Sequence, residues 1–325
     1  MSGHDAWLVC PYTQSALTRL SAVLDTATAC EDRQLEEIVR YLINQGGKRL
    51  RPALLFLAAA FGSATDETLL RAAAALELVH VASLYHDDIM DRARTRRGDA
   101  SVNFRWGNSW ATIAGTHLFA CASKLLAALG DSANQTAAEA TVALCTGQLR
   151  EVENAYNLDL SETEHLAILS LKTATLFELP CQLGALLSHV APTQAEALAC
   201  YGHHLGLAFQ LTDDALDLAG EASQLGKPTA TDLREGVYSL PVLLALHRAG
   251  AVEAEMRSLL EQMHPSESDI RKVLCLVQES GAINEALDLA RQHLVEAQCQ
   301  LASLPNTPAR HSLAGLAEFV LARSS

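Results

Sequence analysis

Two groups of aspartates have a spacing that suits a metal site. Each group places carboxylates at positions i, i+1 and i+4, namely Asp87, Asp88 and Asp91 in the first and Asp213, Asp214 and Asp217 in the second. In a helix the outer two lie on one face, about 5.4 Å apart along the axis, and can hold hard cations. Ligand sets made only of oxygen favour Mg²⁺, which keeps positions for water and substrate phosphates. The pattern therefore predicts a magnesium site that binds a diphosphate.

A single aspartate cluster on an acidic protein is equally well explained as a solvated helix end. Two clusters, each closing an otherwise apolar segment, favour metal binding instead, because an unpaired buried carboxylate is costly. Two polar residues stand on the same predicted helices: His80, seven residues before Asp87, and Gln210, three residues before Asp213. For His80 alone, a buried histidine with a satisfied hydrogen bond is the alternative.

Scarce basic residues supply candidate groups for the anion. Three of the five lysines lie in turn or glycine contexts: Lys48, Lys172 and Lys227. Lys48 belongs to the segment Gly46–Pro52, which also carries Arg49 and Arg51, and four arginines follow the first aspartate cluster: Arg92, Arg94, Arg96 and Arg97. Arginine suits bidentate phosphate contacts, although a solvated basic loop and simple compensation of the nearby acids explain these segments too.

The elements that must position these residues are predicted to be helices. Strand alternation is nearly absent, no Asn-Gly or Asp-Gly hairpin turn occurs, and the apolar residues recur at helical spacing. The chain is therefore predicted to be all-α, as a single domain over residues 1–325. The expected helices are Gln34–Leu42, Pro52–Ala60, Glu67–Asp91, Trp110–Leu129, Asn134–Tyr156, Glu162–His189, Gln194–Leu218, Leu240–Arg248, Ala251–Met263, Glu267–Glu279, Ile283–Leu304 and Arg310–Arg323.

Composition excludes several classes of protein. Hydrophobic residues make up 49% and aromatics only 5%, so a core of Ala and Leu is expected and a disordered chain is excluded. The net charge of −14 opposes nucleic-acid binding. Eight scattered cysteines are expected to be small buried residues and not zinc ligands or disulfides. The longest apolar run, Ala53–Phe61, is shorter than the roughly 18 residues of a membrane span, so we expect a cytoplasmic protein without a transmembrane segment.

The ordered motifs resemble those of the trans-type (E) polyprenyl diphosphate synthases. The similarity covers residues 45–244 closely and rests on seven motifs in the family's order: GGKRLRP (46–52), ELVHVASLYHDDIMD (77–91), RRG (96–98), GQ (147–148), KT (172–173), GLAFQLTDDALD (206–217) and GKPTATDLREG (226–236). The resemblance implies a helical bundle around a deep central cavity, usually as a homodimer. It also implies a prenyl transfer that joins isopentenyl diphosphate to an allylic prenyl diphosphate.

The resemblance also implies a role for each site residue. The six aspartates bind Mg²⁺ that carries the allylic diphosphate. Its phosphates are contacted by Arg96, Lys172 and Lys227, with Thr173 and Gln210 nearby. The diphosphate of isopentenyl diphosphate is bound by Lys48, Arg51, His80 and Arg97. The metal neutralises the leaving group so that the allylic C–O bond ionises, and the released diphosphate takes the proton. We expect the loop 219–236 to order when Mg²⁺ and diphosphate bind.

Two positions depart from the family pattern. Val237 stands where many members carry a second lysine after Gly236, so Lys227 acts alone or Arg234 assists it. Thr116 stands where an acidic residue is common.

Product length is predicted from the wall below the first cluster. Ala82 and Ser83 are small and lie about one turn before Asp87, so a tail longer than fifteen carbons should pass. A medium- or long-chain product is expected, with Phe119 as a candidate floor of the cavity, and we expect the product to pass to a membrane. The alternatives are a geranylgeranyl diphosphate synthase, a terpene cyclase of the same fold, and the regulatory subunit of a heterodimeric synthase. The second aspartate cluster opposes the last two.

Overall fold

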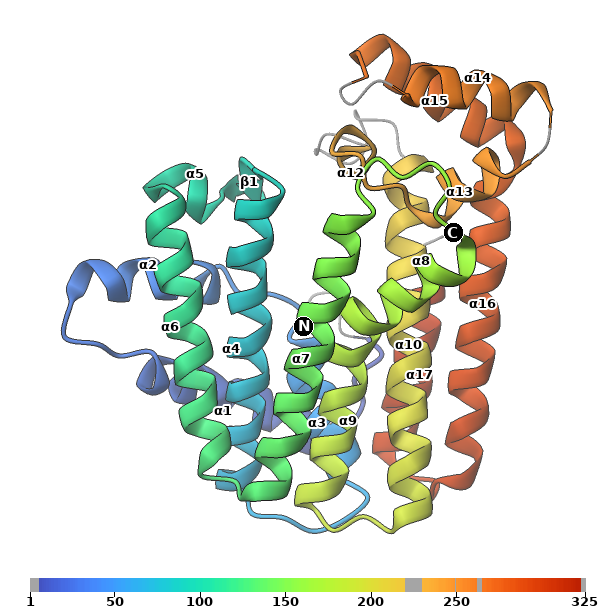
Figure 1. Cartoon of the computed structure of the whole chain (residues 1–325). Helices are drawn as coiled ribbons and strands as arrows, with labels where there is room; N and C mark the ends of the chain where they lie inside the picture. Colours follow the sequence, from blue (N-terminus) through green and yellow to red (C-terminus); the bar gives the residue numbers. More distant parts are fainter. Residues whose placement is uncertain (1–5, 220–229, 249, 262–264, 323–325) are drawn as a thin grey trace. The chain divides into compact units, whose positions relative to one another are not determined.

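The chain folds almost entirely into helices (Figure 1). The computed structural model describes residues 6–219, 230–248, 250–261 and 265–322. These residues form two compact units. Unit 1 contains Met1–Ala140, Leu176–Gly202 and Leu301–Gly315, and unit 2 contains Thr141–Thr175, His203–Gln300 and Leu316–Ser325. The all-α class is confirmed, whereas the single domain over residues 1–325 and the deep central cavity stay predictions.

Unit 1 is built around the buried helix α4 (Asp66–Met90), against which α1, α3, α5 and α6 pack. The helices of its N-terminal part are α1 (Pro11–Ala27), α2 (Arg33–Asn44), α3 (Leu50–Ala59), α4, α5 (Val102–Trp106) and α6 (Asn108–Ala127). Most of α4 is apolar all round, which is typical of a central helix. Among the described residues, α4 is long and apolar enough to cross a membrane, but 67% of its most apolar stretch is buried in the protein, as in the core of a soluble protein.

Close helix contacts in unit 1 require small residues. A Cβ on Gly184 of α9 (Thr175–Leu187) would lie 2.4 Å from the carbonyl oxygen of Leu55 on α3. The two helices therefore approach each other closely only because this position has no side chain.

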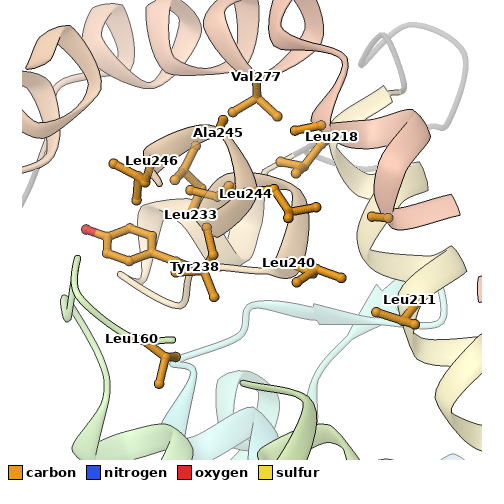
Figure 2. Close-up of a cluster of buried hydrophobic side chains, with 14 of the residues drawn as sticks. Leu160, Leu211, Leu218, Leu233, Tyr238, Leu240, Leu244, Ala245, Leu246 and Val277 are labelled. Carbon is orange, nitrogen blue, oxygen red and sulfur yellow. The ribbon is translucent and has the colours of Figure 1, made fainter. Parts of the chain in front are cut away.

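Unit 2 has a separate core around the short helix α13 (Leu240–Leu246), every residue of which is buried. Figure 2 shows how Leu160, Leu233, Tyr238 and Val277 surround it. The elements that contribute to this unit are α8 (Glu162–Leu169), the π-helix Ser170–Ala174, α12 (Thr231–Arg234), α14 (Ala251–Leu260), α15 (Glu267–Ser280) and α16 (Ala282–Gln300). Four of the described helices have residues in both units: α7 (Asp131–Glu153), α9, of which only Thr175 belongs to unit 2, α10 (Pro192–Ala219) and α17 (Pro308–Ala322).

The short helices α5 and α12 were not expected, and the structure makes three larger corrections to the sequence prediction. Helix α1 was not expected, and its start is fixed by a tertiary contact, since Ser312 Oγ accepts hydrogen bonds from Val9 N and Cys10 N at 3.0 Å each. The continuous helix expected over Glu162–His189 is interrupted by the π-helix and then contains Pro180.

The third correction is a small β-hairpin made by β1 (Thr95–Arg96) and β2 (Asp99–Ala100). Its two turn residues, Arg97 and Gly98, have φ of 55° and 88°. Positive φ at both positions is normally supplied by Asn-Gly or Asp-Gly, and an arginine here concealed the turn.

The cysteine prediction also fails in part. Cys10 and Cys181 are buried, but Cys145, Cys275 and Cys299 are exposed and Cys30, Cys121 and Cys200 are partly exposed. All eight are free thiols, as expected.

Candidate active site

The first aspartate cluster lies at the C-terminal end of α4, and its members differ in exposure. Asp87 and Asp91 are partly exposed, whereas Asp88 is fully buried. The guanidinium of Arg96 donates to Asp88 Oδ1, with Nε at 2.8 Å. Burial raises the pKa of Asp88, and Arg96 opposes that rise. Asp88 thus anchors the hairpin to α4, and Asp87 and Asp91 are the carboxylates of this cluster that solvent reaches.

The glycine-rich segment before α3 is held by two arginines. Gly46, Gly47 and Arg49 all have positive φ, at 75°, 153° and 47°. Arg97 Nη1 donates to the carbonyl of Leu42 at 2.9 Å and also to that of Gly46. A Cβ on Gly47 would come within 3.3 Å of the Arg97 guanidinium, so a glycine here gives that arginine room.

A buried ion pair fixes the same segment to α4. Arg49 Nη1 bonds Glu77, whose side chain is 3% exposed, and Arg49 Nη2 donates to the carbonyl of Ile43 at 3.1 Å. Removing one partner of such a pair would leave a buried charge without compensation. Arg49 and Glu77 therefore have a structural role, which sequence reasoning missed.

The buried side-chain atoms of unit 1 that lack a hydrogen-bond partner include Arg51 Nε, His80 Nδ1 and both amide atoms of Gln45. The Arg51 guanidinium carbon lies 5.1 Å from the centre of the Phe177 ring, which covers one side of the cation. Burial lowers the pKa of Arg51 to about 10. Buried polar groups are normally satisfied, so unsatisfied ones mark a place for a ligand.

The charges around His80 indicate that this ligand is an anion. Burial is the largest cause that lowers the pKa of His80 far below its usual value, and the arginines Arg51, Arg97, Arg96 and Arg49 lower it further. An imidazole surrounded by four guanidinium groups stays neutral until negative charge arrives. The structure thus brings together Arg51, His80 and Arg97 of the predicted anion site, while Lys48 is exposed on the adjoining loop.

The second aspartate cluster, on α10 in unit 2, repeats the exposure pattern. Asp214 is buried, and Asp213 and Asp217 are partly exposed. Gln210 Nε2 donates to Asp214 Oδ1 at 2.8 Å, and Thr173 donates through Oγ1 to Gln210 Oε1 at 3.0 Å. Burial raises the pKa of Asp214 well above its usual value. The predicted pair Thr173 and Gln210 therefore supports Asp214 in a connected network.

His165 lies against the other oxygen of Asp214, with Nε2 4.0 Å from Oδ2. Burial lowers the pKa of His165 to about 4. The raised pKa of Asp214 and the lowered pKa of His165 each oppose the charged form that an ion pair between them would need.

The π-helix presents Lys172 and Thr173, which belong to one predicted motif. Gly147 on α7 makes this possible, because a Cβ there would lie 2.6 Å from the backbone nitrogen of Lys172. Lys172 Nζ forms an ion pair with Glu151, which also accepts from Gln148 Nε2 at 3.1 Å. π-Helical turns often mark functional sites, and this one fixes the position of the lysine.

The other basic residues expected near the second aspartate cluster are Lys227 and Arg234. Lys227 lies outside the described residues, as does most of the loop 219–236 that was expected to order. Arg234 bonds Glu267, with Nε 2.8 Å from Oε1. Val237 is partly buried. Burial raises the pKa of Asp217, whereas the backbone N–H groups of Ala230 and Thr231 and the charge of Arg234 lower it.

The oxygen ligands of the two clusters suit a hard divalent cation, although the described side chains do not converge on one point. One oxygen of Asp88 is buried without a partner, and both clusters offer oxygen ligands only. Within the described part of the chain, no three acidic, histidine or cysteine side chains already converge as a metal site. Such a set suits Mg²⁺, which is usually bound through one or two carboxylates together with water and substrate phosphates.

The ring of Phe119, the candidate floor of the cavity, packs against His86, which directly precedes Asp87, with ring centres 5.8 Å apart. That Phe119 limits the length of the product stays a prediction. Gly115 allows this contact, since a Cβ there would be 2.5 Å from His86 Nε2. Thr116 is exposed on α6.

Comparisons with known proteins match most of the chain. The sequence profile of the polyprenyl synthetase family matches residues 32–277. The nonaprenyl diphosphate synthase of Mycobacterium tuberculosis is 36% identical over 312 residues, which cover 95% of this chain and 93% of that protein. The octaprenyl diphosphate synthase of Escherichia coli is 32% identical over 291 residues, with coverage of 89% and 90%.

Solved structures agree with the sequence comparisons. A polyprenyl synthase from Caulobacter crescentus, complexed with calcium and isoprenyl diphosphate, superposes with a TM-score of 0.93 and 34% identity over 100% of this chain and 99% of that one.

The neutral state of His165 predicts a pH dependence of stability. Its pKa in the folded protein is about 4, below the ordinary value of about 6.5, so the unfolded chain takes up the proton first. The stability due to His165 is present above about pH 6.5 and is lost as the pH falls toward 4. Between about pH 7.5 and pH 5, wild type should lose about 2 kcal/mol more free energy of unfolding than His165→Gln. Urea unfolding at both pH values measures this difference, and equal losses in the two proteins would contradict the assignment.

Proposed function

Since the chain belongs to the polyprenyl synthetase family, we propose that it joins isopentenyl diphosphate to an allylic prenyl diphosphate, with Mg²⁺ as its metal. The observation that carries this proposal is the duplicated cluster. In each copy the middle aspartate is buried and held by a neighbour, and the outer two are partly exposed at the end of an apolar helix.

Asp87 and Asp91 on α4 and Asp213 and Asp217 on α10 hold the magnesium ions. When bound, Mg²⁺ neutralises the charge that develops on the departing diphosphate. Asp88 and Asp214 orient their helix ends through Arg96 and Gln210. Solved relatives contain calcium, a hard cation that prefers oxygen ligands as Mg²⁺ does, which supports this metal class.

The two diphosphates are recognised by different cations. Lys172 lies on the π-helix and forms an ion pair with Glu151 of α7. In this proposal it contacts the allylic diphosphate, as do Arg96 and Lys227. In unit 1, the diphosphate of isopentenyl diphosphate is bound by Arg51, His80 and Arg97, assisted by Lys48. The unpartnered Arg51 Nε and His80 Nδ1 provide the direct contacts.

The proton lost after condensation needs no strong protein base. His80 is neutral, but it lies among arginines and serves to bind the anion. The released diphosphate can accept the proton, while the apolar residues of α4 exclude water from the reacting carbon centre.

The small residues on α4 and the names of the relatives both support a medium- or long-chain product. Ala82 is buried and Ser83 is partly buried, with its hydroxyl donating to the carbonyl of His80 at 2.9 Å. These small residues leave room for a tail below the metal site. The curated relatives are named for nonaprenyl and octaprenyl products. A geranylgeranyl product is the shorter alternative, because solved relatives include geranylgeranyl pyrophosphate synthases.

We also propose a homodimer, located in the cytoplasm, that passes its product to a membrane. Helix α7 exposes an apolar stripe with alternating spacings of three and four residues: Val142, Cys145, Leu149 and Val152. Such a spacing is that of a helix that packs against another helix. A second copy of the same stripe is its proposed partner.

Removal of one outer carboxylate should abolish prenyl transfer. We expect Asp87→Ala and Asp213→Ala each to reduce turnover at least about 100-fold, because the departing diphosphate loses charge stabilisation. The assay combines the purified protein with Mg²⁺, isopentenyl diphosphate, and farnesyl or geranylgeranyl diphosphate, and then sizes the products. Asp288→Ala, an exposed aspartate on α16, is the control, and circular dichroism checks the fold. Near-normal turnover in either site variant would refute the metal assignment.

The length of the prenyl product should depend on the size of the side chain at position 83 of α4. Ser83→Phe places a ring about one helical turn from the metal site and should shorten the product. Ser83→Ala removes the same hydroxyl without adding bulk and should leave the product unchanged. If Ser83→Phe stays active with the wild-type product distribution, the tail does not follow this face.

The homodimer should depend on the stripe of α7. Leu149→Glu introduces a charge into that stripe and should convert the dimer to a monomer in sedimentation experiments. Val295→Glu is the matched control, since Val295 is similarly exposed at 56%, compared with 58% for Leu149, but lies on α16. A wild-type monomer, or a Leu149→Glu dimer as stable as wild type, would contradict the proposed interface.

A further inference from the structure

Two histidines form a contact in unit 2 that the prenyl transfer does not use. His204 on α10 and His293 on α16 place their Nδ1 atoms 3.0 Å apart, and their ring centres lie 5.3 Å apart with a tilt of 31° (Figure 1 labels both helices). Both rings are partly exposed, so solutes can reach them. His203 packs its ring edge-on against His204 at 5.7 Å.

The distance between the two nitrogens is close to that of a pair of zinc ligands. Zinc binds imidazole nitrogen at about 2.0–2.1 Å with tetrahedral angles, so two such nitrogens lie about 3.3–3.4 Å apart. The observed 3.0 Å needs an opening of only a few tenths of an ångström. Without a cation, this contact is a hydrogen bond in which the N–H of one ring donates to the lone pair on the nitrogen of the other ring. A bound metal would instead use the lone pairs of both nitrogens.

Glu296 is the natural third ligand. It stands three residues after His293 on α16, and positions i and i+3 are neighbours on a helix surface. Its charge acts on both His204 and His293. No three such groups converge among the described residues as the side chains now stand, so the exposed Glu296 must change rotamer to complete the set.

We propose that His204 and His293, with Glu296, bind a borderline divalent cation such as Zn²⁺ at a site distinct from the magnesium sites. Imidazole ligands suit Zn²⁺, whereas the carboxylate clusters suit Mg²⁺. His204 precedes Asp213 by nine residues, or about 13 Å along the helix, so the two sites are separate. The cation cross-links α10 to α16 within unit 2, and thereby stabilises the helix that carries the second aspartate cluster.

The ionisation of the pair agrees with this proposal. Burial lowers the pKa of both His204 and His293, and the neighbouring histidines lower it further, against the opposing charge of Glu296. Few protons therefore compete with a cation at neutral pH.

Zinc titration of the full chain tests the proposal. Calorimetry in excess Mg²⁺, which keeps the carboxylate clusters filled, should find a zinc site of one equivalent in wild type. We expect His204→Gln and His293→Gln each to weaken it about 10-fold or more, and Glu296→Gln to weaken it less. His247→Gln, an exposed histidine in the same unit, is the control and should bind as wild type does. Thermal unfolding without zinc checks that each variant is folded.

A second probe identifies the ligand atoms by spectroscopy. Cu²⁺ bound to wild type in excess Mg²⁺ should show electron paramagnetic resonance splitting from two nitrogens, and this splitting should disappear in His204→Gln/His293→Gln. The absence of a zinc site in wild type would overturn the proposal. Equal zinc affinity in wild type and the double variant would also overturn it, because the cation would then sit on the exposed cysteines or elsewhere.

Discussion

The cost of burying charged and polar groups in an Ala- and Leu-rich core is the constraint on which this structure depends. Helix α4 is apolar along most of its length, yet it carries Glu77, His80 and Asp88. Glu77 is compensated by Arg49, from the segment before α3, and Asp88 is compensated by Arg96, from the hairpin. Buried charge therefore determines where the loops around the end of α4 lie.

The same constraint separates structural residues from binding residues. Each aspartate cluster has a buried middle member with a partner inside its own unit, Arg96 for Asp88 and Gln210 for Asp214. Arg51 Nε, His80 Nδ1 and the second oxygen of Asp88 are buried atoms that no group in the described chain satisfies. Buried polar atoms without a partner are tolerated in a folded protein where a ligand supplies the missing hydrogen bonds. Because arginines surround these atoms, the ligand must carry negative charge.

Much of the site could be predicted from sequence, because the spacing of carboxylates on a helix is a local property. The helices that carry both clusters begin and end close to their predicted limits. Contacts between distant segments could not be predicted. Ser312 fixes the start of α1, Glu151 holds Lys172, and His165 covers Asp214, with no pattern in the sequence to signal them. Arg97 in a left-handed turn position concealed the hairpin that delivers Arg96.

The state of His80 tests the central claim most directly. Nitrogen-15 NMR of the histidine side chains, with the His80→Gln spectrum for assignment, reports its protonation with and without isopentenyl diphosphate. The account predicts a neutral His80 in the free protein at about pH 6. Binding of the diphosphate should shift its nitrogen signals and raise its pKa, because the anion offsets the field of the arginines, and isopentenyl alcohol should have no such effect. A protonated His80 in the free protein, or the same response to the alcohol as to the diphosphate, would contradict the account.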